Sequence, residues 1–227
     1  MIYVTGDVHG DVGRFKSKAA KRLRKGDTLL VCGDFGFVWD GSPKEQRTLK
    51  WLGKRPYHIL FLDGTHDNLD LLAGYPEVEL FGGRARQVSG NCYYLPRGGI
   101  YTIESDVVFV MGGGESGDMD ARIEGKTWWP QELPSLEELD RARRALAARQ
   151  NVVDYIVTHE PSSIVSGFLD MDTSRQNQLC AFLDEISRTV RYKHWFFGSC
   201  HLDKVIPPRH HAVYQEILPL KAQLRIG

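Results

Sequence analysis

The sequence repeatedly places a short apolar run directly before an aspartate or histidine that has glycine close by. The run 2–5 is followed by Asp7 and His9, and the run 28–32 is followed by Asp34. The other cases are Asp63-Gly64-Thr65-His66-Asp67 after 57–62, Thr158-His159 after 152–157, and Gly198-Ser199-Cys200-His201 after 194–197. Strands joined by helices form βαβ units, and ligands bind where the carboxyl ends of such strands meet. We therefore expect an α/β protein with Asp and His gathered at that edge.

The remaining pattern predicts helices between the early strands and hairpins in the middle of the chain. The apolar runs 87–94, 100–104 and 107–111 follow one another closely, which indicates antiparallel pairing. Ser135 followed by Glu138 is typical of a capping box at the start of a helix. The expected helices are 11–25, 44–54, 68–73, 135–149 and 173–188, and the expected closing strands are 204–206 and 212–217.

Charge and apolar content exclude several classes of protein. The 29 basic and 29 acidic side chains balance, so we expect no dedicated nucleic-acid surface and no membrane partner. No apolar run approaches the ~18 residues of a membrane span, and Asp7 interrupts the first strand too early for a signal-peptide core. The four cysteines form no CxxC pair, so we expect reduced thiols and a cytoplasmic location.

The length of 227 residues fits one α/β domain, and neither a linker nor an internal repeat interrupts it. We therefore expect a single domain over 1–227. Within it, three glycines at 112–114 precede a long irregular stretch. Such a stretch is either functional or a surface loop packed down by its own side chains. Segment 114–134 is thus expected to be a lid or cap, or a loop that Trp128 and Trp129 hold in place.

The residues at the strand ends indicate a metal centre. Singly, Asp7 could cap the next helix and Asp34 could be a turn residue, but their recurrence at equivalent strand ends favours one shared site. Carboxylate and imidazole ligands without thiolate pairs suit Mn²⁺, Fe²⁺, Zn²⁺ or Mg²⁺, and we expect Mn²⁺. Asp34 could bridge two ions through its two oxygens, and two ions ~3.5–4 Å apart commonly promote phosphate ester hydrolysis.

These motifs resemble those of the calcineurin-like metallophosphoesterases. The family's motifs are DxH, GD, GNH followed by an acidic residue, a lone His after a strand, and GHxH. Here they correspond to Asp7-x-His9, Gly33-Asp34, Gly64-Thr65-His66-Asp67, His159 and Gly198-Ser199-Cys200-His201. The resemblance implies a four-layer α/β/β/α sandwich of two mixed sheets. It also implies a phosphomonoesterase or phosphodiesterase that uses a metal-activated water.

The resemblance assigns roles position by position. His66 would be the catalytic histidine, which protonates the leaving group or stabilises the transition state, and Asp67 would orient it. One ion would be held by a complete set of four ligands, Asp7, His9, Asp34 and His201.

The set for a second ion is incomplete. It would share the bridging carboxylate and take His159, but Thr65 stands where the family has Asn and Ser199 stands where it has His. Hydroxyls are poor ligands, so we expect one firmly bound ion and a second that binds weakly or not at all. Glu160 or Cys200 could substitute, but Cys200 lies between two alternate-facing positions, and a solvent-facing charge is the more usual role for a residue such as Glu160.

Two functional hypotheses follow. The first is a metal-dependent phosphoester hydrolase that acts on a phosphorylated small molecule or nucleotide. The second is a catalytically weakened phosphoesterase scaffold that binds a metal, a nucleotide or a partner. In a third reading, a single ion only stabilises the fold.

Substrate contacts are harder to assign from the sequence. Arg84, Arg86 and Arg97 could bind phosphate oxygens or could form a solvated charged face. His210 and His211 are interpreted as a surface loop.

Overall fold

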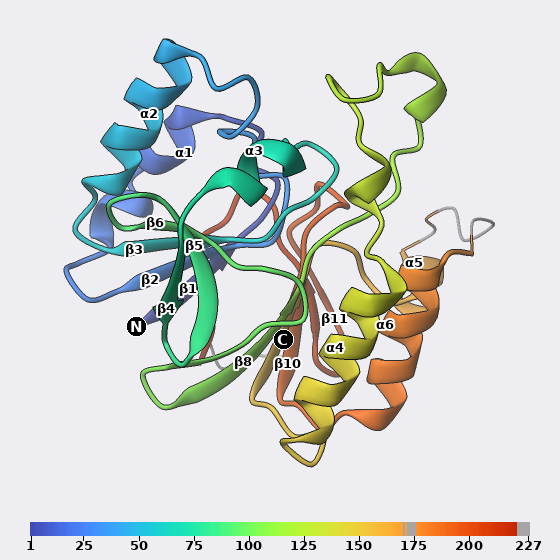
Figure 1. The fold of residues 1–227 in the computed structure, drawn as a ribbon. Helices are drawn as coiled ribbons and strands as arrows, with labels where there is room; N and C mark the ends of the chain where they lie inside the picture. Colours follow the sequence, from blue (N-terminus) through green and yellow to red (C-terminus); the bar gives the residue numbers. More distant parts are fainter. Residues whose placement is uncertain (170, 172–175, 222–227) are drawn as a thin grey trace.

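Two β-sheets form the centre of the molecule, and helices cover the outer face of each (Figure 1). The computed structural model describes residues 1–169, 171 and 176–221. The first sheet runs in the order β13 (Leu218–Pro219), β1 (Ile2–Thr5), β2 (Thr28–Val31), β3 (His58–Phe61), β6 (Cys92–Tyr94), β5 (Gly83–Ser89) and β4 (Glu77–Leu80). The second runs in the order β11 (Lys204–Ile206), β12 (His210–Ala212), β10 (His194–Phe197), β9 (Tyr155–Thr158), β8 (Asp106–Met111) and β7 (Ile100–Ile103).

The helices lie outside these sheets or between strands. The α-helices are α1 (Val12–Lys16), α2 (Pro43–Gly53), α3 (Leu69–Gly74), α4 (Leu136–Ala147), α5 (Ser163–Phe168) and α6 (Gln178–Thr189). The short 3₁₀ helices are η1 (Ala20–Arg22), η2 (Met119–Ala121) and η3 (Pro130–Glu132).

Each sheet has a parallel centre flanked by antiparallel strands. In the first sheet β1, β2, β3 and β6 are parallel neighbours, while β13, β5 and β4 pair in antiparallel fashion. In the second sheet β8, β9, β10 and β12 are parallel, while β7 and β11 are antiparallel to their neighbours. The predicted α/β sandwich of two mixed sheets is therefore confirmed.

Alternation along the strands explains the layers. Successive strand residues point to opposite faces of a sheet. Leu29 and Val31 of β2 accordingly pack under α1 and α2, and Leu30 fills the space between the sheets. On the other side, apolar residues of α4 and α6 cover the second sheet, among them Leu139, Leu146, Phe182 and Leu183. Burial on both faces is why these strands read as continuous apolar runs rather than as alternating ones.

Side-chain caps fix where the helices begin. The Ser135 hydroxyl accepts a hydrogen bond from the Glu138 amide, and the Glu138 carboxylate accepts one from the Ser135 amide, so the predicted capping box is confirmed. The helix predicted over 11–25 is wrong in its length. It starts at its Asp11 cap but ends at Lys16, because the Ser17 hydroxyl accepts from the Ala20 amide and starts the separate turn η1.

Several other predicted elements have different bounds. The predicted strand 87–94 is a hairpin, in which Gly90 with a φ of 49° makes the turn between β5 and β6. The predicted strand 212–217 is wrong beyond Ala212, where β12 ends, and the next strand, β13, begins only at Leu218. Strand β4 and helix α5 were not predicted. Of the predicted helix 173–188, residues 173–175 lie outside the described residues, and α6 begins after the Asn177 cap.

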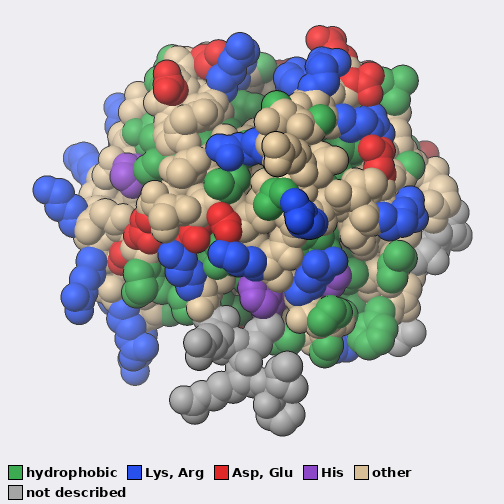
Figure 2. Space-filling view, turned by 90° about the horizontal axis from the view of Figure 1, so that it is seen from below, with side chains coloured by type: hydrophobic (Ala, Val, Ile, Leu, Met, Phe, Trp, Pro, Cys, Tyr) green, Lys and Arg blue, Asp and Glu red, His purple; other side chains and the backbone are tan. Residues whose placement is uncertain are grey.

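The surface carries charges of both signs. On the face seen in Figure 2, Lys and Arg side chains are interspersed with Asp and Glu and with hydrophobic groups. Within the described parts of the chain, no helix has the length and apolar character needed to cross a bilayer.

Candidate metal centre

The parallel strands deliver their polar side chains to one edge of the sandwich through strained backbone. Non-glycine residues rarely adopt a positive φ, and each instance costs of the order of 1–3 kcal/mol. Yet five residues that follow β1, β2 and β10 have φ between 44° and 59°, namely Asp7, His9, Asp34, Ser199 and His201. Strain gathered at one place indicates that the turns are shaped to aim these side chains at a common point.

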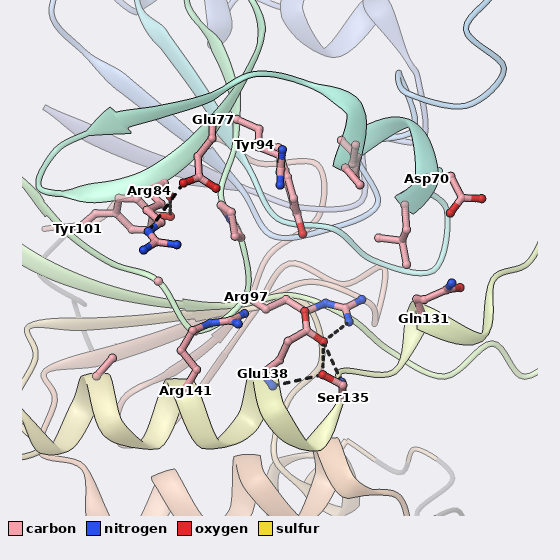
Figure 3. Close-up of a pocket in the computed structure, with 18 residues that line it drawn as sticks. Asp70, Glu77, Arg84, Tyr94, Arg97, Tyr101, Gln131, Ser135, Glu138 and Arg141 are labelled. Carbon is pink, nitrogen blue, oxygen red and sulfur yellow. Dashed lines mark hydrogen bonds and ion pairs between the residues drawn. The ribbon is translucent and has the colours of Figure 1, made fainter.

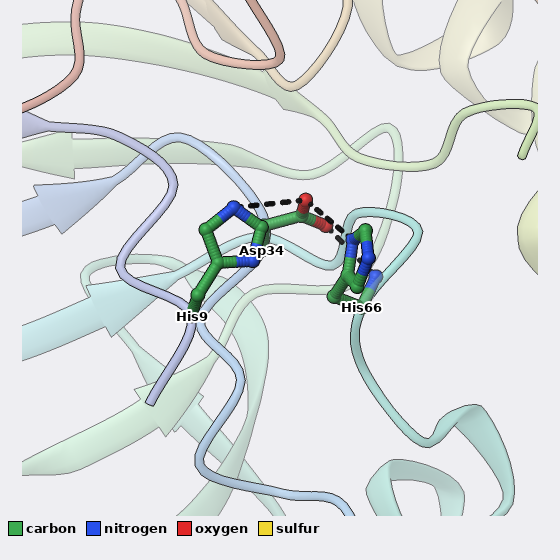
Figure 4. Close-up of side chains that lie close together, drawn as sticks. All are labelled: His9, Asp34 and His66. Carbon is green, nitrogen blue, oxygen red and sulfur yellow. Dashed lines mark hydrogen bonds and ion pairs between the residues drawn. The ribbon is translucent and has the colours of Figure 1, made fainter. Parts of the chain in front are cut away.

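Asp34 lies at the centre of this group. Its carboxylate is held between two imidazoles, with Oδ2 at 2.9 Å from Nδ1 of His66 and 3.7 Å from Nε2 of His9 (Figure 4). Oδ1 accepts from the His66 amide at 2.8 Å and lies 3.6 Å from Nε2 of His159. Glycine is required at position 64, because a Cβ there would overlap the Asp34 carboxylate and approach the His159 ring.

Electrostatics keep Asp34 ionised. Burial by itself would raise its pKa, but His159, followed by the hydrogen bond and charge of His66, outweighs burial and holds the pKa well below its ordinary value. The same hydrogen bond raises the pKa of His66. Burial lowers the pKa of His9 and so favours the neutral imidazole, which is the form that binds a metal.

The four residues assigned to the first ion fit a divalent metal. Nε2 of His9 and Nε2 of His201 face each other at 3.0 Å, so two ring nitrogens converge on one point. Oδ1 of Asp7 accepts from the Ser199 amide, while its buried Oδ2 has no hydrogen-bond partner among the described residues. Asp7, His9, Asp34 and His201 would be the residues that hold a divalent ion, because an unpartnered carboxylate oxygen and facing imidazole nitrogens are donors of the kind such an ion takes. Behind His201, the Tyr214 ring stacks at 4.9 Å and fixes its orientation.

The residues assigned to a second ion fit less well. Oγ1 of Thr65 is 3.1 Å from Nδ1 of His66, so this hydroxyl already has a partner. The amide of Ser199 binds Asp7, and its hydroxyl is again a neutral donor in place of an imidazole. His159 is buried. Burial by itself would lower its pKa, but the charges of Asp34 and Asp7 outweigh burial and raise the pKa of His159 to about 9. The ring thus acts as a counter-charge to the two carboxylates.

Metal-binding donors nevertheless overlap around Asp34. Donor atoms of His9, Asp34 and His66 lie within 4.8 Å of one another, and so do those of Asp7, Asp34 and His159. Asp34 belongs to both groups, which agrees with the bridging position expected for it. The structure therefore gathers Asp7, His9, His159 and His66 around Asp34, whereas His201 belongs to neither group and lies beside them through its contact with His9.

Asp67 has a different local role from the one expected. Its carboxylate is fully buried and accepts hydrogen bonds from the backbone amides of Phe35, Gly36 and Gly64. Burial and the nearby Asp34 charge raise the pKa of Asp67 to about 7. In the described structure Nδ1 of His66 is paired with Asp34 and Thr65 instead. Asp67 thus joins the loops after β2 and β3, and it is Asp34 that contacts the His66 ring.

Glu160 and Cys200 occupy different surroundings. The Glu160 carboxylate is partly buried, accepts from the Glu115 amide at 3.0 Å, and has its pKa raised by burial, so it is not the solvent-facing charge considered above. The Cys200 thiol donates to the Met171 sulfur at 3.3 Å and packs against the core of the second sheet.

The three arginines considered for phosphate contacts lie elsewhere, around a cavity of about 800 Å³ between β4, β5 and α4 (Figure 3). Arg84 is exposed and pairs with Glu77 at 3.8 Å, and Arg86 donates to a backbone carbonyl. Arg97 is buried and pairs with Asp63 at 2.6 Å and with Glu138 at 3.5 Å. These bonds give the arginines structural partners outside the metal centre.

The interpretation of His210 and His211 as a surface loop is wrong. Both belong to β12, which pairs with β10. His211 is 4% exposed and stacks on Phe196 at 4.6 Å. A two-proline sequence before the pair suggested a loop, but a parallel partner strand overrides that local preference.

One residue beside the centre had no signal in the sequence. Arg122, from segment 114–134, places Nη2 at 3.0 Å from Nε2 of His66 and donates from Nη1 to the carbonyl of Thr65. The segment had been expected to be a lid, a cap or a packed loop, but nothing in its sequence distinguished this arginine from any other surface charge.

Two mixed sheets with carboxylates and imidazoles at their strand ends define an α/β sandwich that carries a candidate metal centre. The profile of the calcineurin-like phosphoesterase family matches residues 1–206, and the chain belongs to that family. Membership supports a role as a metal-dependent phosphoesterase and a divalent metal as its cofactor.

Other comparisons add little. No curated protein matches the chain. Among solved structures, the chain is similar to a crystal structure of a protein of unknown function from Aquifex aeolicus, with 14% identity over 85% of this chain and 87% of that one. The TM-score is 0.37, so this likeness carries no argument.

Proposed function

We propose that this protein is a metal-dependent hydrolase of phosphate monoesters or diesters, with Mn²⁺ as its ion and a phosphorylated small molecule or nucleotide as its substrate. The observation that carries the proposal is the cluster of His9, Asp34 and His66 donor atoms, with His201 against His9. A divalent ion held there supplies Lewis-acid activation of water and of a phosphoryl oxygen.

The chain's own residues position the proton donor. His66 is held at Nδ1 by Asp34, its Nε2 lies 3.0 Å from Nη2 of Arg122, and 42% of its side chain is exposed. A histidine in this orientation can donate a proton from Nε2 to the leaving alcohol oxygen. The ionised Asp34 favours the protonated ring through the hydrogen bond they share.

The first test is hydrolysis of bis(p-nitrophenyl) phosphate and of p-nitrophenyl phosphate in Mn²⁺. We expect metal-dependent turnover, and we expect His66→Ala to lower it by at least about 100-fold, which is a typical contribution of a general acid. The ratio of the two rates reports diester against monoester preference. Because His66 is outside the first ligand set, the bound Mn²⁺ of the variant should remain at the wild-type level. Equal turnover by wild type and His66→Ala would contradict the assigned role.

The competing function is a weakened scaffold that binds a metal, a nucleotide or a partner without turnover. The hydroxyls of Thr65 and Ser199 at two ligand positions favour it. Tight Mn²⁺ binding together with no hydrolysis of either ester would support this function over the first.

A further inference from the structure

Segment 114–134 is anchored at several points beside the metal centre. Trp129 is 2% exposed and donates from Nε1 to Asp70 at 2.9 Å. The carboxylate of Glu132 accepts a hydrogen bond from the Ser116 hydroxyl, and the backbone carbonyl of Glu132 accepts one from Arg97. In Figure 1 the segment is the yellow-green loop at the upper right, between β8 and α4. These anchors hold the segment in a defined position next to the strand ends.

Arg122 is fixed within this segment and directed at the centre. Its Nε pairs with Asp118 at 2.8 Å, and Nη1 donates to the carbonyls of Thr65 at 3.1 Å and Thr127 at 3.3 Å. Nη2 contacts Nε2 of His66 at 3.0 Å. The side chain is only 13% exposed, whereas that of Asp118 is 60% exposed. The guanidinium is thus largely buried, and its Nη2 end faces His66.

The position of this charge coincides with the incomplete part of the ligand set. Thr65 replaces one ligand of the second ion, and Arg122 binds the backbone of that same residue. A phosphoryl group in transfer requires positive charge around its oxygens, which two-ion sites supply with both metals. Guanidinium remains charged at any ordinary pH, and its planar fork matches two phosphate oxygens.

We infer that Arg122 binds the phosphate of the substrate and supplies, on the Thr65 side, the positive charge that a second metal ion supplies in two-ion sites. The inference rests on the proposed function, since it concerns the same centre. On binding, a phosphate oxygen accepts from Nη2 in place of Nε2 of His66. That exchange releases Nε2 of His66 from Arg122, so the two side chains can face different oxygens of one phosphate group.

The test is the affinity of the Mn²⁺-loaded protein for inorganic phosphate, measured by calorimetry, together with the Mn²⁺ bound per chain. We expect Arg122→Ala to raise the dissociation constant about 10- to 100-fold, the range for loss of a charge-assisted hydrogen bond. Arg122→Lys keeps the charge but loses the fork, so an intermediate value is expected. The amount of Mn²⁺ bound per chain should be the same in the wild type, in Arg122→Ala and in Arg122→Lys.

Lys126→Ala is the matched control, because it removes one positive charge from an exposed position of the same segment. Its dissociation constant should stay within about twofold of wild type, as for a screened surface charge. The inference fails if Arg122→Ala binds phosphate like wild type, if Lys126→Ala weakens binding equally, or if Arg122→Ala loses the metal.

Failure of the proposed function has a different signature. No ester turnover by wild type, with phosphate affinity still dependent on Arg122, would remove hydrolysis and retain the phosphate contact. Ester turnover with phosphate affinity independent of Arg122 would retain hydrolysis and remove the contact.

Discussion

At the residue scale, surroundings decide what each histidine can do. His9 and His201 follow strands on strained backbone and turn their nitrogens toward each other. His210 and His211 lie within a strand instead, and His211 is stacked against Phe196. Burial, followed by neighbouring positive groups, lowers the pKa of each of these two strand histidines to about 4. The same side chain is thus a metal-ligand candidate at a strand end and a packing residue inside a strand.

This difference predicts a sensitivity to acid. The folded-state pKa of His211 is about 4, below the unfolded value of about 6.5. The stability that depends on the neutral ring is therefore present above pH 6.5 and is lost as pH falls toward 4. We expect His211→Phe, which keeps the stacking, to reduce the loss of unfolding free energy between pH 6.5 and 4 by on the order of 2–3 kcal/mol. Urea unfolding of the wild type and of His211→Phe at several pH values between 6.5 and 4 measures this change in unfolding free energy. An unchanged pH dependence in the variant would contradict the assignment.

At the element scale, one tryptophan holds segment 114–134 in place. Trp129 is buried, contacts Trp39 edge to face at 5.5 Å, and has its indole nitrogen paired with Asp70 on α3. Trp128 is only partly buried. The segment has little regular structure of its own beyond η2 and η3, so its position depends on such anchors.

Loss of that anchor should open the segment locally. Trp129→Ala removes a fully buried aromatic side chain, worth about 3–5 kcal/mol. Trypsin cleavage after Arg122 and Lys126 should therefore accelerate by at least about 100-fold, while the sheets stay folded. Trp128→Ala is the control, for which we expect much smaller acceleration. Similar cleavage rates in the two variants would show that Trp129 is not the anchor.

At the scale of the whole molecule, a buried ion pair joins the layers around the site. Asp63 follows β3 of the first sheet and is 0% exposed, and Arg97 binds it from the connection that leads into the second sheet. Arg97 also contacts Glu138 on α4 and the carbonyl of Glu132 in the segment above. Tyr94 donates to the remaining oxygen of Asp63. One guanidinium thus links both sheets, a helix and the segment that carries Arg122.

Breaking this pair should be costly because it leaves a buried charge. Arg97→Met is expected to lower the unfolding free energy by about 3–5 kcal/mol. The double variant Asp63→Asn/Arg97→Met should recover most of that loss, since no charge is stranded and Tyr94 keeps an acceptor. Arg143→Met serves as the control, because the Arg143–Glu185 pair is exposed, and less than about 1 kcal/mol is expected. Urea unfolding compares all three, and a double variant no more stable than Arg97→Met would contradict the explanation.

By itself the sequence determined the fold class and the composition of the centre. Short doubly buried strands are continuous apolar runs, and residues directly after parallel strands must meet at one edge, so the gathering of Asp7, His9, Asp34, His159 and His201 follows from local pattern and topology alone. Strand β4, by contrast, has only an alternating, partly exposed pattern, and its identity depends on pairing with β5.

Only the tertiary structure decided which groups face each other across the layers. Asp67 binds the amides of the loop after β2, 31 and 32 residues away, and it is Asp34 that contacts the His66 ring. Arg122 contacts His66 over a separation of 56 residues. Contacts over such separations are set by how the two sheets and the segment pack, and no periodicity or spacing within the sequence records them.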